Sequence, residues 1–114
     1  MIDPDNPPRW WTAGEANDAL PRVNAAIDRA RGAVAGTTGN GHRTPATFEE
    51  VVAELEGDGI VLRDLSPGLV DFPAQAGNGK GYWLCWLVGE PEVAWWHWPE
   101  DGFAGRRPLT EAPD

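Results

Sequence analysis

Residues 82–88 read YWLCWLV and residues 93–98 read VAWWHW, with the turn-forming sequence GEPE at positions 89–92 between them. The two runs hold five of the seven tryptophans, and two extended apolar runs joined by a short Gly- and Pro-containing segment predict a β-hairpin. Tryptophan buries a large area and carries a single N–H donor. Such a hairpin forms a core, a docking face or a ligand platform.

Two further extended segments precede this hairpin. Apolar alternation predicts strands at 60–64 and 69–74, before those at 82–88 and 93–98. Turn-forming residues separate them, at Ser66-Pro67-Gly68 and at Asn78-Gly79. Short turns between successive strands predict a four-stranded antiparallel meander.

The N-terminal half has helical spacing instead. Thr12-Ala13-Gly14-Glu15 matches the capping box that starts a helix. Apolar residues then recur every three or four positions, at Ala16, Leu20, Val23, Ile27, Ala30 and Val34. Pro21 predicts a kink or loosened turn at positions 17–21, because proline removes a helical hydrogen bond. A second capping box at Thr47 predicts a short helix that ends near 57–59.

The expected fold is therefore α+β, with two N-terminal helices packed on one face of the four-stranded antiparallel meander. The length of 114 residues suits a single domain, residues 1–114. Within it we expect a frayed lead-in at 1–10, a mobile loop at 33–46, and a tail that covers the sheet edge before fraying at 110–114.

Charge and cysteine content limit the classes of partner and the cellular compartment that we expect for this protein. The net charge of -9 argues against nucleic-acid or anionic-membrane partners, which require clustered cations. The N-terminal sequence lacks the pattern of an export signal, and no apolar stretch is long enough to cross a membrane. The one cysteine excludes an internal disulfide. We expect a soluble, cytoplasmic protein.

The turns predict how the strands pair. A two-residue turn at Asn78-Gly79 places Asp71 opposite Trp86, and pairing of Val88 with Val93 places Trp86 opposite Trp95. One face of the sheet then carries Val70, Phe72, Trp83, Cys85, Leu87, Ala94, Trp96 and Trp98. The other carries Asp71, Tyr82, Leu84, Trp86, Val88, Val93, Trp95 and His97.

Two amphipathic helices can cover about one face of such a sheet. We assign them to the Phe72/Cys85/Trp96 face and expect the tail, a second copy or a ligand to cover the opposite, aromatic face. The candidate functional residues are on or beside that opposite face: Asp71, Tyr82, Trp86, Glu90, Trp95, His97 and Arg106.

The chemistry open to these residues is limited. Asp71 lies in an apolar strand, where it is a structural acceptor, a general base or a metal ligand. His97 lies roughly 12 Å from Asp71 between Cα atoms by sheet spacings, which predicts no direct pair. We predict neither a metal nor a cofactor, because structural zinc-ligand spacing is absent. Cys85 is expected to be a small buried hydrophobe on the helix-covered face.

Four ordered motifs resemble a bacterial family known as domain of unknown function 2203: WTAGEANDALP from Trp11, DLSPGLVDFPA from Asp64, LCWLVGEPEVAWWH from Leu84 and GFAGRRPL from Gly102. The resemblance implies a small α+β domain with a helical hairpin and a curled antiparallel sheet. It implies no established activity, substrate or cofactor. The chain departs from the family between Gly32 and Pro45, where family members look longer and more helical.

Three functions stay open, and whether the protein is an enzyme is among the open questions. The favoured one is an interaction or scaffold module that pairs through the Trp-rich sheet face, as a homodimer or with a protein partner. The second is a small-molecule or metal-assisted enzyme using Asp71, Glu90, His97 and Arg106. The third is a binder that stacks ligands on Trp86 and Trp95.

Overall fold

Two helices precede an antiparallel sheet in the computed structural model, which describes residues 2–3, 5–35, 48–65 and 67–113. The elements are α1 (Ala13–Ala35), α2 (Phe48–Gly57), β1 (Val61–Asp64), β2 (Leu69–Gln75), β3 (Gly81–Leu87), β4 (Trp95–His97) and β5 (Arg107–Pro108). Sheet order follows chain order, β1-β2-β3-β4-β5. The α+β class is confirmed. The described sheet has five strands rather than four, because the tail pairs with β4.

Helix α1 begins at the predicted capping box. The Thr12 amide donates to Glu15 Oε1 at 3.0 Å, and the Glu15 amide donates to Thr12 Oγ1 at 3.1 Å. These bonds satisfy two amides that the first helical turn leaves without intrahelical partners. The helix continues through Pro21, so the loosened turn expected there does not end it. The capping box at Thr47 and most of the loop predicted at 33–46 lie outside the described residues.

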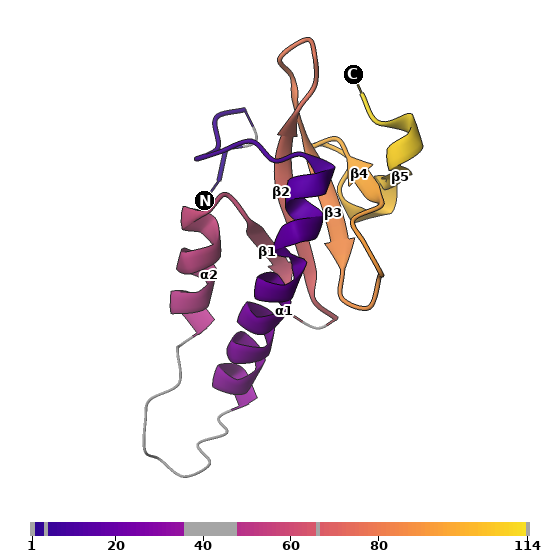
Figure 1. The fold of residues 1–114 in the computed structure, drawn as a ribbon. Coiled ribbons are helices and arrows are strands. Elements are labelled where there is room, and N and C mark those ends of the chain that lie inside the picture. The colour runs from indigo at the N-terminus through magenta and orange to yellow at the C-terminus, as the bar shows by residue number, and fades with distance from the viewer. Residues whose placement is uncertain (1, 4, 36–47, 66, 114) are drawn as a thin grey trace.

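Both helices cover the same face of the sheet (Figure 1). The apolar stripe predicted for α1 is buried along its described side chains: Ala16, Leu20, Val23, Ile27 and Ala30. From α2, Val51 and Leu55 join the same core. The sheet side of this core consists of Val70, Phe72, Ala74, Leu84, Trp86 and Trp96. We call this side of the sheet the helix-covered face.

The hairpin of β2 and β3 is shifted by one residue from the predicted register. Asp71 pairs with Cys85 rather than with Trp86. The turn is a three-residue loop at 77–79, in which Gly79 has a φ of 90° and the preceding asparagine has no positive φ. A two-residue type I′ turn requires positive φ at both central residues. The prediction was wrong because the loop is one residue longer.

The next hairpin is also shifted by one residue. Trp96 pairs with Leu84 rather than with Cys85. Val93, which the predicted register placed opposite the end of the third strand, donates its amide to Asn17 Oδ1 of α1 at 2.6 Å. Because a helix side chain occupies this amide, Val93 does not extend the ladder.

Together the two shifts exchange the two faces of β3, whereas the alignment of β2 with β4 is the one predicted. A slip of one residue moves every side chain of a strand to the other face. Trp86, predicted on the open face, is therefore buried beneath the helices, and Cys85, predicted beneath the helices, lies on the opposite side. That opposite side, which we call the distal face, carries Asp71, Trp83, Cys85, Trp95 and His97.

The distal face is covered in part by the chain itself. Ile2, in the segment expected to be a frayed lead-in, packs against Val61 and Trp83. Trp83 and Trp86 are each only 2% exposed. The expectation that the helices leave Trp86 uncovered is thus wrong, and Trp83, expected beneath the helices, is buried on the distal face instead. Among the described residues, the exposed large hydrophobic side chain is Phe103, at 47%.

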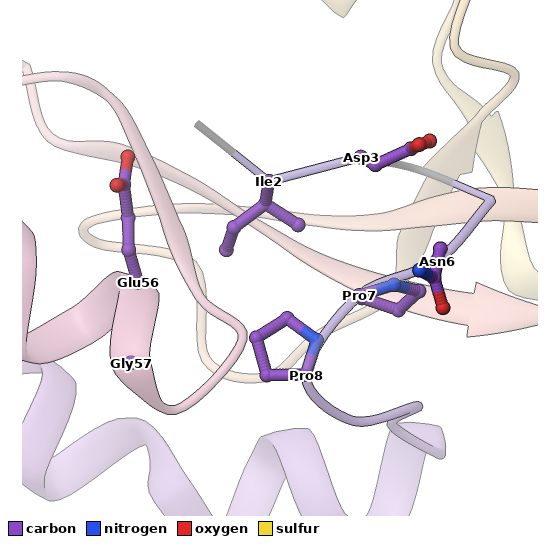
Figure 2. A pocket seen from close by; sticks show the side chains of 7 residues that line it. All are labelled: Ile2, Asp3, Asn6, Pro7, Pro8, Glu56 and Gly57. Atoms are coloured by element: carbon purple, nitrogen blue, oxygen red, sulfur yellow. The ribbon is translucent and has the colours of Figure 1, made fainter.

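A pocket of about 570 Å³ lies where the N-terminal segment passes the end of α2 (Figure 2). Its ionisable side chains, Asp3 and Glu56, are both acidic. None of the candidate residues predicted from the sequence lines it. Within the described ranges, no helix is both long and apolar enough to cross a membrane.

Candidate functional site

Asp71, Cys85 and His97 meet on the distal face. They come from the adjacent strands β2, β3 and β4, with Asp71 opposite Cys85 and His97 one diagonal step further. A carboxylate oxygen, the sulfur and a ring nitrogen all lie within 4.8 Å of one another. The three residues are 1%, 0% and 4% exposed. Ionisable groups this deeply buried must be paired with one another or bind a ligand.

The prediction that Asp71 and His97 lie too far apart for direct contact is wrong. His97 Nε2 lies 3.0 Å from Asp71 Oδ2. The two residues are two strands and two positions apart, as expected, but the residue opposite Asp71 on the intervening strand is Cys85 instead of Trp86. A small side chain between them leaves room for the carboxylate and the imidazole to meet.

Both ring nitrogens of His97 face acceptors. Nδ1 lies 2.8 Å from the carbonyl oxygen of Trp98, and Nε2 contacts the Asp71 carboxylate. Since neither a carbonyl nor a carboxylate can donate, the imidazolium form satisfies both contacts. Burial lowers the pKa of His97, but the hydrogen bond and charge of Asp71 and the Trp98 carbonyl outweigh burial, so the pKa is raised.

Arg63 of β1 completes the cluster. Its Nε donates to Asp71 Oδ2 at 2.8 Å, and its guanidinium lies 4.7 Å from the Trp83 ring centroid. One carboxylate between an imidazolium and a guanidinium leaves a net positive charge at this point of a chain whose net charge is -9. Oδ1 of Asp71 is buried and has no hydrogen-bond partner among the described residues. A buried carboxylate oxygen without a partner is an unusual feature of a folded protein.

Cys85 is buried and free, as predicted, although on the other face. Burial, followed by the charge of Asp71, raises the pKa of its thiol well above the ordinary value. It is therefore a thiol at neutral pH, and a reactive thiolate nucleophile is not favoured. A metal ion that displaces the proton could still use the sulfur as a ligand.

A pocket of about 350 Å³ opens beside this cluster. Its polar wall consists of Arg63, Asp71 and His97, and the rest is formed by Leu69, Pro99, Gly102 and Phe103. A few converging polar groups within an otherwise apolar wall are typical of small-molecule sites.

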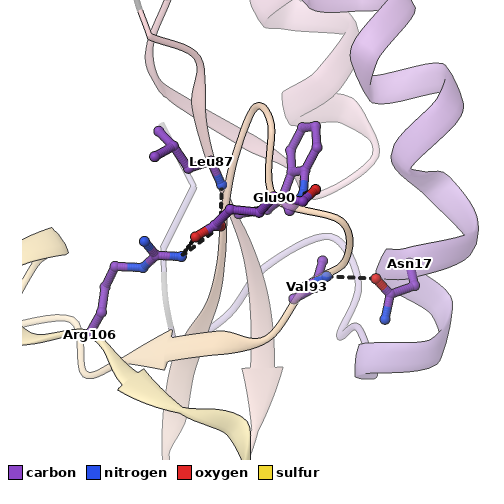
Figure 3. Close-up of polar contacts among 6 residues, drawn as sticks. Asn17, Leu87, Glu90, Val93 and Arg106 are labelled. Atoms are coloured by element: carbon purple, nitrogen blue, oxygen red, sulfur yellow. Dashed lines mark hydrogen bonds and ion pairs between the residues drawn. The ribbon is translucent and has the colours of Figure 1, made fainter.

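Glu90 and Arg106 bind each other instead of converging with His97 (Figure 3). The carboxylate oxygens of Glu90 accept from Arg106 Nη2 at 2.8 and 2.9 Å, and Oε1 also accepts from the Leu87 amide at 2.8 Å. This pair joins the β3–β4 turn to the segment before β5. Its partners are protein groups, which favours a structural role.

The remaining candidate residues are aromatic. Trp86 donates its Nε1 proton to the Glu90 carbonyl at 3.0 Å in the helix-covered core. Tyr82 is half-buried against Trp96, with ring centroids 5.5 Å apart, and burial raises its pKa. Trp95 lies on the distal face, where the Arg106 guanidinium is 5.0 Å from its ring. The structure thus brings together Asp71 and His97, and places Trp86 away from them.

A family model described as an uncharacterized conserved protein, DUF2203, matches residues 29–109. The chain belongs to the DUF2203 family. The match includes the whole cluster on the distal face and the neighbouring pocket, whereas residues 13–28 of α1 lie outside it. No curated protein and no solved structure matches the chain.

Sequence reasoning missed two members of this DUF2203 site, Arg63 and Cys85. Arg63 could have been predicted from the sequence. Val61 pairs with Asp71, and side chains two positions apart in a strand share a face, so Arg63 lies on the same face as the Asp71 carboxylate. Cys85 required the correct register. Its assignment depended on one residue in the loop at 77–79.

Proposed function

We propose that this protein binds Zn²⁺ through Asp71, Cys85 and His97 and uses the ion in metal-assisted small-molecule chemistry. The observation that carries the proposal is the buried Oδ1 of Asp71, which has no hydrogen-bond partner among the described residues although a sulfur and an imidazole lie beside it. Zinc would occupy lone pairs that the protein leaves unused. Metal-assisted chemistry was one of the functions left open by the sequence. Asp71 and His97 were among its expected residues, whereas Cys85 takes the place of Glu90 and Arg106.

The donor set suits zinc. Thiolate, imidazole and carboxylate are the usual ligands of Zn²⁺. Three protein ligands leave a coordination position for water or substrate, as in catalytic zinc sites. An ion with such an open position can activate water or polarise a carbonyl group.

Charge balance also supports binding. In the metal-free cluster, Cys85 and His97 each hold a proton that zinc would displace. Two protons carry the same charge as one Zn²⁺ ion. The rest of the cluster would therefore carry the same total charge beside Arg63 in the metal-free protein and in the zinc-bound protein.

Neighbouring contacts would orient two of the ligands. The Nδ1 contact of His97 with the Trp98 carbonyl, at 2.8 Å, is of the kind that fixes the ring of a metal-binding histidine. Arg63 occupies Oδ2 of Asp71 and leaves Oδ1 for the ion. A cytoplasmic location agrees with this proposal, because a reducing compartment keeps the thiol available.

Self-association through a Trp-rich sheet face has less support. Its premise was an aromatic face carrying Trp86 and Trp95 that the helices leave uncovered, and Trp86 is 2% exposed in the helix-covered core. Ligand stacking on Trp86 and Trp95 together is also disfavoured, because Trp86 lies in the helix-covered core while Trp95 lies on the distal face.

The test is metal binding by the 114-residue chain after treatment with a chelator. Native mass spectrometry should show one retained zinc ion, and titration should release about two protons per ion. Cobalt in place of zinc should give a thiolate-to-cobalt charge-transfer band. A protein that takes up no zinc, or whose cobalt spectrum lacks the thiolate band, contradicts the proposal.

Variants locate the site. Cys85→Ser and His97→Gln should each weaken zinc binding by at least about tenfold, since each removes one of three ligands. His42→Gln serves as the control, because it removes the other histidine of the chain. Equal zinc affinity in all three variants would place the ion elsewhere. Circular dichroism identifies any variant that fails to fold, and the cobalt spectrum of the unsubstituted protein decides the question without variants.

A further inference from the structure

We infer that the pocket beside Asp71 and His97 binds a small carboxylate that carries an apolar, single-ring-sized body. The inference rests on the proposed zinc site, because the ion would supply a second positive contact for the carboxylate. Three features of the pocket carry the inference: its charge, its apolar wall and its size.

The first feature is the fixed positive charge of Arg63. Its Nε is held by Asp71, and its guanidinium lies over the Trp83 ring. The two terminal nitrogens have no hydrogen-bond partner among the described residues, and the side chain is 37% exposed. A guanidinium fixed at one edge presents its remaining N–H groups in the planar arrangement that suits a carboxylate.

The surrounding cluster does not cancel this charge. Asp71 is the acidic side chain among those that line the pocket, and the two positive charges of the proposed zinc ion would balance its carboxylate and the Cys85 thiolate. Arg63 therefore leaves a positive wall in an acidic protein. A monoanion neutralises this wall.

The second feature is the apolar wall formed by Leu69, Pro99 and Phe103. Phe103 is 47% exposed, which is unusual among the large hydrophobic side chains described. The Arg106 guanidinium lies 4.8 Å from the centroid of its ring. An aromatic ring held at the mouth of a pocket offers a stacking surface for the body of a ligand.

The third feature is size. The volume of about 350 Å³ is near the lower end of small-molecule pockets, which run from about 300 to 1,000 Å³. This suits one ring or a short aliphatic chain attached to the carboxylate.

The experiment uses benzoate as the probe, with benzamide as a neutral control of the same shape and inorganic phosphate as a second anion. Binding to the full chain is followed by amide chemical shifts, in the zinc-loaded and metal-free forms. We expect benzoate to shift the amides of Leu69, Gly102 and Phe103 in both forms, with about tenfold tighter binding when zinc is present. Benzamide should bind at least about tenfold more weakly.

Two variants test the recognition. Arg63→Gln should weaken benzoate binding by about tenfold or more, while Arg29→Gln, which removes the same charge on α1, should leave binding unchanged. Arg63 contacts the buried Asp71, so Arg63→Gln could lose stability. Phe103→Ala changes an exposed side chain instead and should also weaken benzoate binding.

The outcomes separate the two proposals. Retained zinc with no benzoate shift at the pocket overturns this inference and leaves the zinc site standing. Absence of zinc overturns the proposed function, and benzoate binding that still depends on Arg63 and Phe103 would then support the pocket alone. Phosphate binding without benzoate binding, or benzoate binding indifferent to both variants, overturns the inference.

Discussion

His97 reaches Asp71 across Cys85, with 3.0 Å between the imidazole Nε2 and the carboxylate Oδ2. The cysteine is fully buried opposite Asp71, so the volume at position 85 determines whether the other two side chains can meet. Because Cys85 is small, the packing of the sheet allows the charged contact between Asp71 and His97 to form. This dependence makes the cluster sensitive to a substitution that adds no charge.

Cys85→Leu should separate Asp71 and His97. Overpacking a buried position costs about 1–3 kcal/mol, and loss of the carboxylate contact should lower the pKa of His97. Urea unfolding measures the first effect and a histidine NMR titration measures the second. Cys85→Ala is the control, since it adds no volume and should keep the histidine pKa raised. An unchanged pKa in Cys85→Leu would contradict the proposed role of side-chain volume.

The metal-free protein should lose stability as the pH rises from the unfolded pKa of histidine through the raised pKa of His97. The folded pKa of His97 is raised above the unfolded value of about 6.5, so the folded state binds the proton more tightly. Its stabilising contribution is complete below the unfolded pKa and disappears as the pH passes through the folded pKa. Urea midpoints measured across this window, with chelator present, should fall with increasing pH.

His97→Gln provides the comparison for this titration. The variant has no imidazole at position 97, so the corresponding part of the pH dependence should vanish. If the variant retains the same slope as the unsubstituted protein, another group is responsible.

Local patterns predicted the helices and the existence of the strands. The capping box of Thr12 and Glu15 depends on residues three positions apart, and its hydrogen bonds formed as expected. The apolar stripe of α1 depends on helical periodicity, which local sequence contains. These features need no knowledge of the rest of the molecule.

Register could not be predicted in the same way. In the β2–β3 hairpin it depended on whether the connecting loop has two residues or three. In the β3–β4 hairpin it depended on a hydrogen bond from the Val93 amide to Asn17, 76 positions away in the chain. An error of one residue turned over β3 and moved Cys85 and Trp86 to the wrong faces. The site residues Asp71 and His97 were recognised individually, but their contact was missed because it passes over a residue of that strand.

Gly68 should tolerate no side chain. Its φ is 99°, and an added Cβ would lie 2.6 Å from Val88 Cγ2. Gly68→Ala combines backbone strain of about 1–2 kcal/mol with a steric clash, so we expect a loss of at least ~2 kcal/mol in the free energy of unfolding. Gly89→Ala is matched, because Gly89 has a φ of 106° and no atom of the structure described here within 4 Å of an added Cβ. Equal losses in both variants would show that Val88 yields without cost.

The pair of Glu90 and Arg106 should contribute more stability than a surface ion pair. Its side chains are 21% and 12% exposed, and Glu90 also accepts a hydrogen bond from the Leu87 amide. Glu90→Gln removes the charge that Arg106 contacts while keeping an amide oxygen, and we expect a loss of about 1–3 kcal/mol in the free energy of unfolding.

Glu54→Gln makes the same chemical change in the pair of Glu54 and Arg29, whose side chains are 58% and 47% exposed. Water and salt screen that pair, so its loss should cost less than about 1 kcal/mol. Urea unfolding at low and high salt compares the two variants. Because Arg106 also lies 5.0 Å from the Trp95 ring, Glu90→Gln should change tryptophan fluorescence, and Glu54→Gln should not. Equal small losses in both variants would mean that partial burial adds nothing to the Glu90 pair.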